Sequence, residues 1–146
     1  MKADADTSFI ISLYVSEEER SAKADQYMAR QREALPFTPY HRLEVRNGIR
    51  LRVKNAAMTA RERAAAFADV EHDLEAQMVL VHQPLDWTGT LKRAEALGLA
   101  HTESIGGAAA DLFHVAAALE LGFKEFLTFD KLQRLLAGAA GLKLGV

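Results

Sequence analysis

The chain has 146 residues, of which 49% are hydrophobic and 26% charged, enough for one globular domain with a buried core. Its net charge of −2 gives no bulk attraction to nucleic acid, and the lack of cysteine excludes disulfides, thiolate metal sites and a cysteine nucleophile. No apolar run approaches the roughly 18 to 20 residues that cross a bilayer, and the N-terminus lacks a signal-peptide pattern. We therefore expect a cytoplasmic protein with no membrane partner, in which any metal has oxygen or imidazole ligands.

Capping signals and apolar periodicity predict helices that alternate with short strands along the chain. We expect helices over residues 16–32, in the segment that follows residues 37–39, and over 59–77, 87–97, 111–121 and 132–137. We expect short strands over residues 1–5, 78–81, 126–129 and 142–144. With no internal repeat and no low-complexity linker, this alternation predicts a single α/β sandwich over residues 1–146.

Two aspartates frame the last helix and strand before the C-terminal helix. Asp111 opens a helix in which Val115 and Ala118 follow on the same apolar face. Asp130 ends a buried strand, and in an open parallel sheet the carboxyl ends of the strands face the ligand crevice. Both positions therefore favour a catalytic or ligand-binding role for these aspartates. Each aspartate taken alone has a plainer interpretation, as a helix cap or a turn residue.

A third aspartate stands near the N-terminus. Asp6 precedes Thr7 and Ser8 at a predicted turn between a very short strand and the apolar run over residues 9–14. The strand is too short to define this edge of the sheet firmly, and Asp4 is a possible substitute for Asp6. We expect one of these two carboxylates to lie at the same edge of the sheet as the acids described above.

A glutamate inside the third predicted helix completes the set of acids. Gly48 and Leu51 follow Glu44 at i+4 and i+7, so we expect this face of the helix to look inward. Glycine destabilises a helix relative to alanine, and Gly48 is therefore expected to permit a close approach of backbone or substrate. Glu44 taken alone could instead pair with Arg46 or His41 near the surface.

These residues resemble the PIN-domain family, and within it the VapC-type toxin ribonucleases of bacterial toxin–antitoxin pairs. The strongest match covers residues 111–119 together with Phe126-Leu127-Thr128-Phe129-Asp130, and the tail over 139–142 agrees. Asp6-Thr7-Ser8 matches as well, and so does a glutamate after an apolar-Thr-Pro segment, here Glu44. The resemblance implies one PIN-like nuclease domain, a three-layer α/β/α sandwich around a short-stranded, mostly parallel central sheet.

The resemblance also implies a metal-dependent endoribonuclease. We expect Asp6, Glu44 and Asp111 to ligate Mg²⁺ or Mn²⁺, and Asp130 to ligate a second ion or to orient a water molecule. Hard cations prefer carboxylate oxygens, and clustered carboxylates repel one another until a cation lies between them. The implied partners are an RNA substrate, a cognate antitoxin protein and a second copy of the chain in a homodimer.

Basic side chains recur every fourth residue along the helix that carries Glu44: Arg42, Arg46, Arg50 and Lys54. They predict one basic stripe on a different face from Glu44. RNA backbone or an antitoxin tail could bind there, or the stripe is a solvated helix face. His114 stands three residues after Asp111 and could reach a substrate phosphate, although a packed helix histidine is the plainer interpretation.

The segment before Asp111 departs from the family pattern. Relatives often carry an arginine and a hydroxyl residue there, whereas this chain has Gly106-Gly107-Ala108-Ala109-Ala110. An arginine could hold the substrate phosphate or support an acid, so its absence could weaken catalysis or alter substrate choice. Three hypotheses follow: a toxin ribonuclease, a catalytically degenerate PIN-fold protein that binds RNA or a protein partner without cleavage, and a structured-DNA nuclease or maturation factor.

Overall fold

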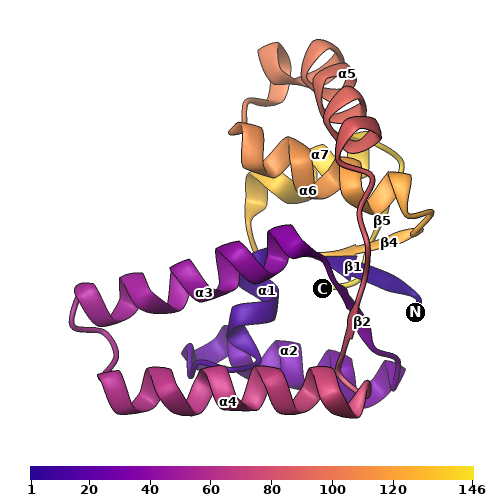
Figure 1. The fold of residues 1–146 in the computed structure, drawn as a ribbon. Coiled ribbons are helices and arrows are strands. Elements are labelled where there is room, and N and C mark those ends of the chain that lie inside the picture. The colour runs from indigo at the N-terminus through magenta and orange to yellow at the C-terminus, as the bar shows by residue number, and fades with distance from the viewer. The chain divides into compact units, whose positions relative to one another are not determined.

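Parallel strands and helices alternate in the computed structural model, which describes residues 1–146 except the side chain of Glu18. Contacts divide the chain into two compact units. Unit 1 contains Met1 and Thr7–Gln83, and unit 2 contains Lys2–Asp6 and Pro84–Val146. Each unit has its own parallel strands with helices packed against them, so the predicted α/β class is confirmed (Figure 1). Within the described part of the chain, no helix is both long and apolar enough to span a membrane.

Unit 1 is built from one parallel strand pair and the helices that surround it. Its elements are α1 (Thr7–Ser12), α2 (Glu18–Gln31), β2 (Leu35–Phe37), α3 (Pro39–Lys54), α4 (Ala60–Ala76) and β3 (Leu80–His82). β2 and β3 pair in parallel, with Leu35 opposite Leu80 and Phe37 opposite His82. α3 and α4 lie side by side and are joined by a short loop (Figure 1).

The start of α4 in unit 1 follows from local side-chain chemistry. Thr59 accepts a hydrogen bond from the Glu62 amide (3.1 Å) while the Glu62 carboxylate accepts one from the Thr59 amide (3.2 Å), as the sequence pattern predicts. The analogous prediction at Ser16 is wrong. The residue before α2 is Glu17, which makes no side-chain cap, and its amide donates to the Ser21 hydroxyl (2.8 Å).

Unit 2 is built around a three-stranded parallel sheet in the order β1-β4-β5. Its elements are β1 (Ala3–Ala5), α5 (Trp87–Ile105), α6 (Ala109–Glu120), β4 (Glu125–Leu127), α7 (Lys131–Ala139) and β5 (Lys143–Leu144). The five strands of the chain thus pair as a three-stranded and a two-stranded sheet.

The helix that starts at Trp87 does not end at Gly98, as expected, but continues to Ile105. A Cβ on Gly98 would lie 3.3 Å from Cδ1 of Leu112 in α6. The glycine therefore permits close packing of α5 on α6 and does not act as a helix stop. Tertiary packing outweighs the local cost of glycine in this helix.

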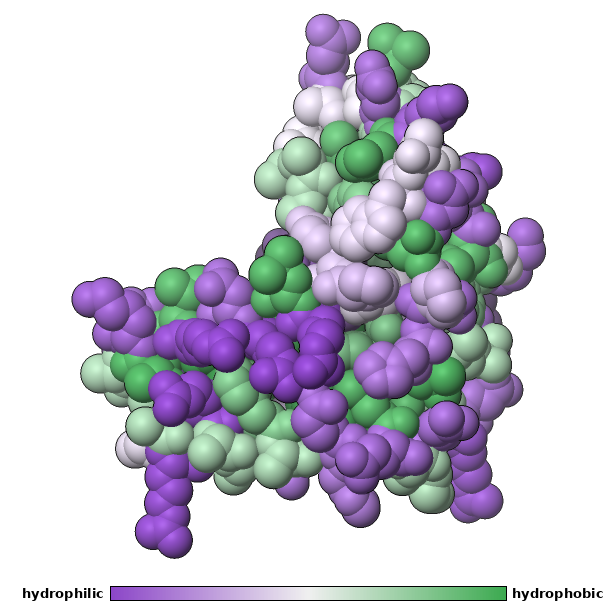
Figure 2. Space-filling model, in the orientation of Figure 1, coloured by the Kyte–Doolittle hydropathy of each residue, from purple (hydrophilic) through white to green (hydrophobic). Residues whose placement is uncertain are grey.

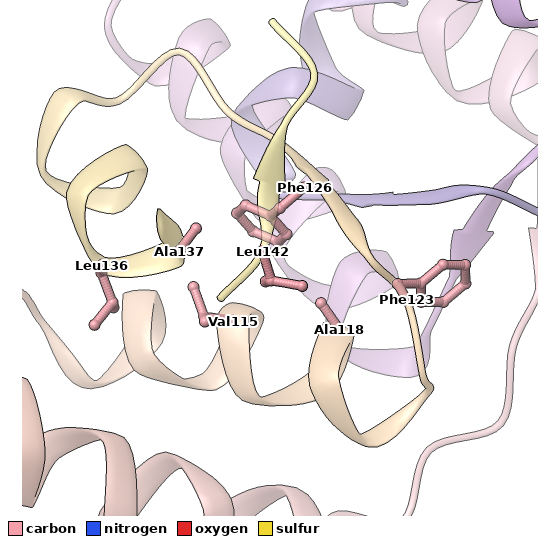
Figure 3. Close-up of a cluster of buried hydrophobic side chains, with 7 residues drawn as sticks. All are labelled: Val115, Ala118, Phe123, Phe126, Leu136, Ala137 and Leu142. Carbon is pink, nitrogen blue, oxygen red and sulfur yellow. The ribbon is translucent and has the colours of Figure 1, made fainter. Parts of the chain in front are cut away.

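The core of unit 2 lies between α6, α7 and the strands β4 and β5. α6 is buried continuously from Phe113 to Ala118, which is typical of a helix covered on most sides. Figure 3 shows side chains from these elements packed against one another. The buried cluster comprises Val115, Ala118, Phe123, Phe126, Leu136, Ala137 and Leu142. This packing holds the first turns of α6 and α7, where two of the predicted site residues lie, on the same unit as β1.

Candidate active site

The parallel pairing of β1 with β4 places Asp6 beside Thr128. Ala5 lies opposite Leu127 in the register, so the next residues of the two strands are neighbours. The Asp6 amide donates to the Leu127 carbonyl (3.0 Å), and the Thr128 hydroxyl donates to Oδ2 of Asp6 (2.7 Å). Both side chains are buried. A buried carboxylate requires such a donor, because an unsatisfied one would cost several kcal/mol.

Further hydrogen bonds extend this pair into an aspartate network, made of Asp6, Thr128, Asp130, Gln133 and Asp111. The Asp130 amide donates to the Thr128 hydroxyl oxygen (3.1 Å), and Oδ1 of Asp130 accepts from the Gln133 amide (2.8 Å). The buried Gln133 side chain then donates through Nε2 to the backbone carbonyl of Asp111 (3.4 Å). Three of the four predicted acids therefore belong to one connected network in unit 2.

Asp111 stands in the first turn of α6, and Asp130 directly precedes α7. Oδ2 of Asp111 accepts from the Ala108 amide (2.9 Å) from the third position of α6, so Asp111 is not itself the N-cap. Asp130 is the N-cap of α7. Each contact engages one oxygen and leaves the carboxylate a second acceptor oxygen.

Asp4 places a second carboxylate beside Asp6. Its side chain is 1% exposed and accepts a hydrogen bond from the Ala5 amide (2.8 Å). Burial raises the pKa of Asp4 to about 7; the Ala5 hydrogen bond and the charge of His114 oppose this shift, and the charge of Asp6 adds to it. His114 itself is buried. Unit 2 thus holds two neighbouring carboxyl groups away from water, and burial is the main cause of the raised pKa of Asp4.

The donor chemistry fits a hard divalent cation. The predicted ligands in unit 2 are Asp6, Asp111 and Asp130, which offer only carboxylate oxygens. Among the described side chains, no three histidines, aspartates or glutamates lie close enough together to hold one metal ion. Hydrogen bonds of Thr128 and Gln133 connect these three aspartates to one another.

Glu44 belongs to unit 1. Its Oε1 accepts a hydrogen bond from the Thr7 hydroxyl (2.7 Å), which joins α3 to α1. A Cβ on Gly48 would lie 2.8 Å from Cδ1 of Ile11, so the close neighbour at Gly48 is a side chain and not the expected backbone. The inward orientation expected for Leu51 is wrong, since this side chain is 50% exposed. That Glu44 acts together with the three aspartates remains a prediction.

Sequence reasoning did not single out Thr128 or Gln133. Thr128 could have been noticed as a polar residue within an otherwise apolar strand, where a buried hydroxyl needs a partner. Gln133 stands three residues after an N-cap aspartate, which is the spacing of a capping box. Its side chain reaches Asp111 instead, because α6 lies against α7 in unit 2.

The glycines before α6 have a structural reason. Gly106 and Gly107 have φ angles of +85° and +113°, which side chains other than glycine rarely adopt. A Cβ on Gly107 would also lie 3.1 Å from Cδ2 of Leu132 in α7. Side chains are therefore disfavoured at Gly106 and Gly107, the first two positions of the segment before Asp111.

Comparisons with known proteins agree with this fold. The family model of the PIN domain matches residues 5–139, and the chain belongs to the PIN-domain family. A search of curated proteins finds no match. Among solved structures, the chain is similar to VapC20 of Mycobacterium tuberculosis, described as a sarcin-ricin loop cleaving toxin, with 18% identity, a TM-score of 0.67 and coverage of 97% of this chain and 96% of that chain. It is also similar to FitAcB from Neisseria gonorrhoeae, with 17% identity, a TM-score of 0.55 and coverage of 97% and 95%.

Proposed function

We propose that this protein is a metal-dependent endoribonuclease that hydrolyses RNA phosphodiester bonds and acts as the toxin of a toxin–antitoxin pair. The observation that carries the proposal is the aspartate network. In it Thr128 binds the Asp6 carboxylate and the Asp130 amide, and Gln133 binds the Asp130 carboxylate and the Asp111 backbone carbonyl. Membership of the PIN-domain family and the similarity in fold to an RNA-cleaving toxin support it.

We propose Asp6, Glu44 and Asp111 as the ligands of Mg²⁺ or Mn²⁺, and Asp130 as the ligand of a second ion or the residue that orients the attacking water. Among the described residues these carboxylates do not form a preassembled metal cluster. When bound, such an ion polarises the phosphoryl oxygens and makes a water molecule more acidic. Thr128 holds the Asp6 carboxylate through its hydroxyl and so orients it. Supporting hydrogen bonds of this kind orient metal ligands in proteins.

The proposal includes partners that the family resemblance implies. A cognate antitoxin would restrain the nuclease, and two copies of the chain would form a homodimer in the cytoplasm. The basic residues of α3, Arg42, Arg46 and Arg50, are proposed RNA contacts. His114 is also a proposed contact, although its side chain is buried and its charge acts on Asp4.

Cleavage of a mixed pool of structured RNA in Mg²⁺, Mn²⁺ and EDTA tests the proposal. Asp111→Asn and Asp6→Asn should each lower the cleavage rate more than about 100-fold, because loss of residues that only support metal ligands already costs 10–100-fold. Asp86→Asn is the matched control. Asp86 caps α5 by accepting from the Gly89 amide (3.1 Å), and asparagine preserves such a cap.

The outcomes separate the hypotheses. Metal-dependent cleavage that persists in Asp86→Asn and disappears in both other variants supports the nuclease and its acids. Cleavage retained in both Asp6→Asn and Asp111→Asn would contradict the assigned roles. If the folded wild-type protein cuts RNA in no metal, the degenerate PIN-fold alternative is favoured, as the apolar segment before α6 suggests.

A further inference from the structure

The face of α3 that packs against α4 carries an arginine row, made of Arg42, Arg46 and Arg50. Two of these side chains converge on one carboxylate oxygen: Nη1 of Arg42 lies 2.8 Å and Nη2 of Arg46 lies 2.5 Å from Oε1 of Glu71. All of these residues belong to unit 1. Figure 2 shows hydrophilic side chains gathered over α3 on its side toward α4.

An aromatic ring holds the other end of the arginine row. The guanidinium carbons of Arg46 and Arg50 lie 4.9 Å and 5.0 Å from the centre of the Phe67 ring. Phe67 and Glu71 are one helical turn apart on α4, as successive arginines are on α3. The cation–π contacts therefore hold two long side chains beside α4 and lower the entropy that a ligand must overcome to order them.

The charges of this cluster do not balance. The cluster contains three guanidinium groups and one carboxylate, so the formal charge of the cluster is positive. The side chains of Arg42 and Glu71 are each 41% exposed, which leaves the cluster accessible to solvent. Burial opposes ionisation of Glu71, but the hydrogen bonds and charges of Arg46 and Arg42 outweigh it and lower its pKa.

The position of Glu71 indicates what the arginine row can bind. Arginine holds phosphate and carboxylate oxygens with the same charge-assisted hydrogen bonds, so the Glu71 oxygen lies where a phosphate oxygen would be held. Four residues of helix rise about 6 Å, a step similar to the separation of neighbouring phosphates along a strand. The guanidinium planes also offer surfaces on which bases can stack.

We propose that the arginine row binds the phosphate backbone of RNA and that Glu71 competes with the RNA for Arg42 and Arg46. The identity of the ligand rests on the proposed function, because an RNA substrate supplies the repeated phosphates. The row is a binding surface in unit 1, formed by residues other than the acids of the aspartate network in unit 2. Glu71 sets the affinity of this surface without taking part in cleavage.

RNA binding by the full chain tests this, measured with a labelled single-stranded RNA of mixed sequence in EDTA and in the Asp111→Asn background, so that cleavage does not interfere. Adding Glu71→Gln should tighten binding several-fold, because it removes the competing anion. Adding Arg42→Gln and Arg46→Gln together should weaken binding at least about 10-fold and reduce the salt dependence by about one unit of slope per arginine.

Glu75→Gln is the control for the added charge. Glu75 is an exposed glutamate one turn beyond Glu71 on α4, and its substitution changes the net charge equally. The proposal requires Glu71→Gln to tighten binding more than Glu75→Gln does. Thermal unfolding of each variant, followed by circular dichroism, separates an effect on RNA binding from an effect on the fold.

Three results would overturn the proposal: equal binding by the Glu71 and Glu75 variants, no loss of binding in the double arginine variant, or no RNA binding at all. Weaker binding of a polyglutamate peptide by the arginine variants, with unchanged RNA binding, would assign the row to an acidic protein partner instead. If the protein cuts no RNA but binds RNA through the arginine row, the result would support the RNA-binding role of the row and contradict the proposed nuclease activity.

Discussion

Two buried threonines, Thr38 and Thr128, occupy equivalent positions in the two sheets but form different hydrogen bonds. Thr38 directly follows β2 and Thr128 directly follows β4, and in each unit the neighbouring parallel strand donates an amide to the residue just before the threonine. Gln83 donates to the Phe37 carbonyl (3.0 Å), as Asp6 donates to the Leu127 carbonyl (3.0 Å). The backbone arrangement is thus repeated.

The side chains at these equivalent positions decide the outcome. The Thr38 hydroxyl accepts from the His41 amide (3.1 Å) and caps α3. The Thr128 hydroxyl instead donates to a carboxylate, because β1 is followed by Asp6, whereas β3 is followed by Gln83. One strand-end geometry therefore serves as a helix cap in unit 1 and as a support for acids in unit 2.

The interiors of β1 and β3 differ as well, and this difference predicts the largest effect, a change in the free energy of unfolding with pH. Asp4 lies in β1 at the register position that Val81 takes in β3. The pKa of Asp4 is about 7 in the folded protein against an ordinary 3.8. Between about pH 4 and pH 7 the unfolded chain releases a proton that the folded protein keeps, so the free energy of unfolding falls as the pH rises through this window.

Asp4→Asn should remove this pH dependence. We expect the variant to be more stable than the wild type above pH 7, by up to about 4 kcal/mol for three pKa units, and to differ little near pH 4. Urea unfolding at several pH values, in EDTA so that no cation contributes, measures the difference. Parallel stability curves for the two proteins would show that Asp4 ionises as an ordinary carboxyl group.

Removal of the Thr128 hydroxyl should have the next largest effect. Thr128→Val keeps the shape of the side chain but removes the hydroxyl that donates to Asp6 and accepts from the Asp130 amide. We expect cleavage of RNA to slow 10–100-fold, as for other supports of metal ligands. Single-turnover cleavage rates across a Mg²⁺ titration measure the effect. An unchanged rate at every Mg²⁺ concentration would remove Thr128 from the site.

The equivalent change in the other sheet should have the smallest effect. Thr38→Val removes the cap of α3 and should lower the free energy of unfolding by about 1 kcal/mol. The cleavage rate per folded molecule should stay the same. Denaturant unfolding and the cleavage assay measure the two quantities. A loss of activity as large as that of Thr128→Val would contradict the distinction between the two threonines.

The arginine row shows which contacts sequence periodicity predicts and which it does not. The four-residue spacing predicted that Arg42, Arg46 and Arg50 share one face of α3, and all three contact residues of α4. The spacing carried no information about Glu71 or Phe67, which lie on a different helix. Whether a basic stripe is solvated, paired or stacked depends on which helix packs beside it.

The pattern of apolar and capping residues along the chain was enough to predict the α/β class and most of the helices. It also predicted the cap of α4, because a cap joins residues three positions apart. It also drew attention to Asp6, Asp111 and Asp130, since strand ends and helix starts are legible in the sequence. The partners of these acids were decided by folding. Thr128 reaches Asp6 across 122 positions only because β1 and β4 pair in one parallel register, and that register depends on the packing of α6 and α7 against the strands.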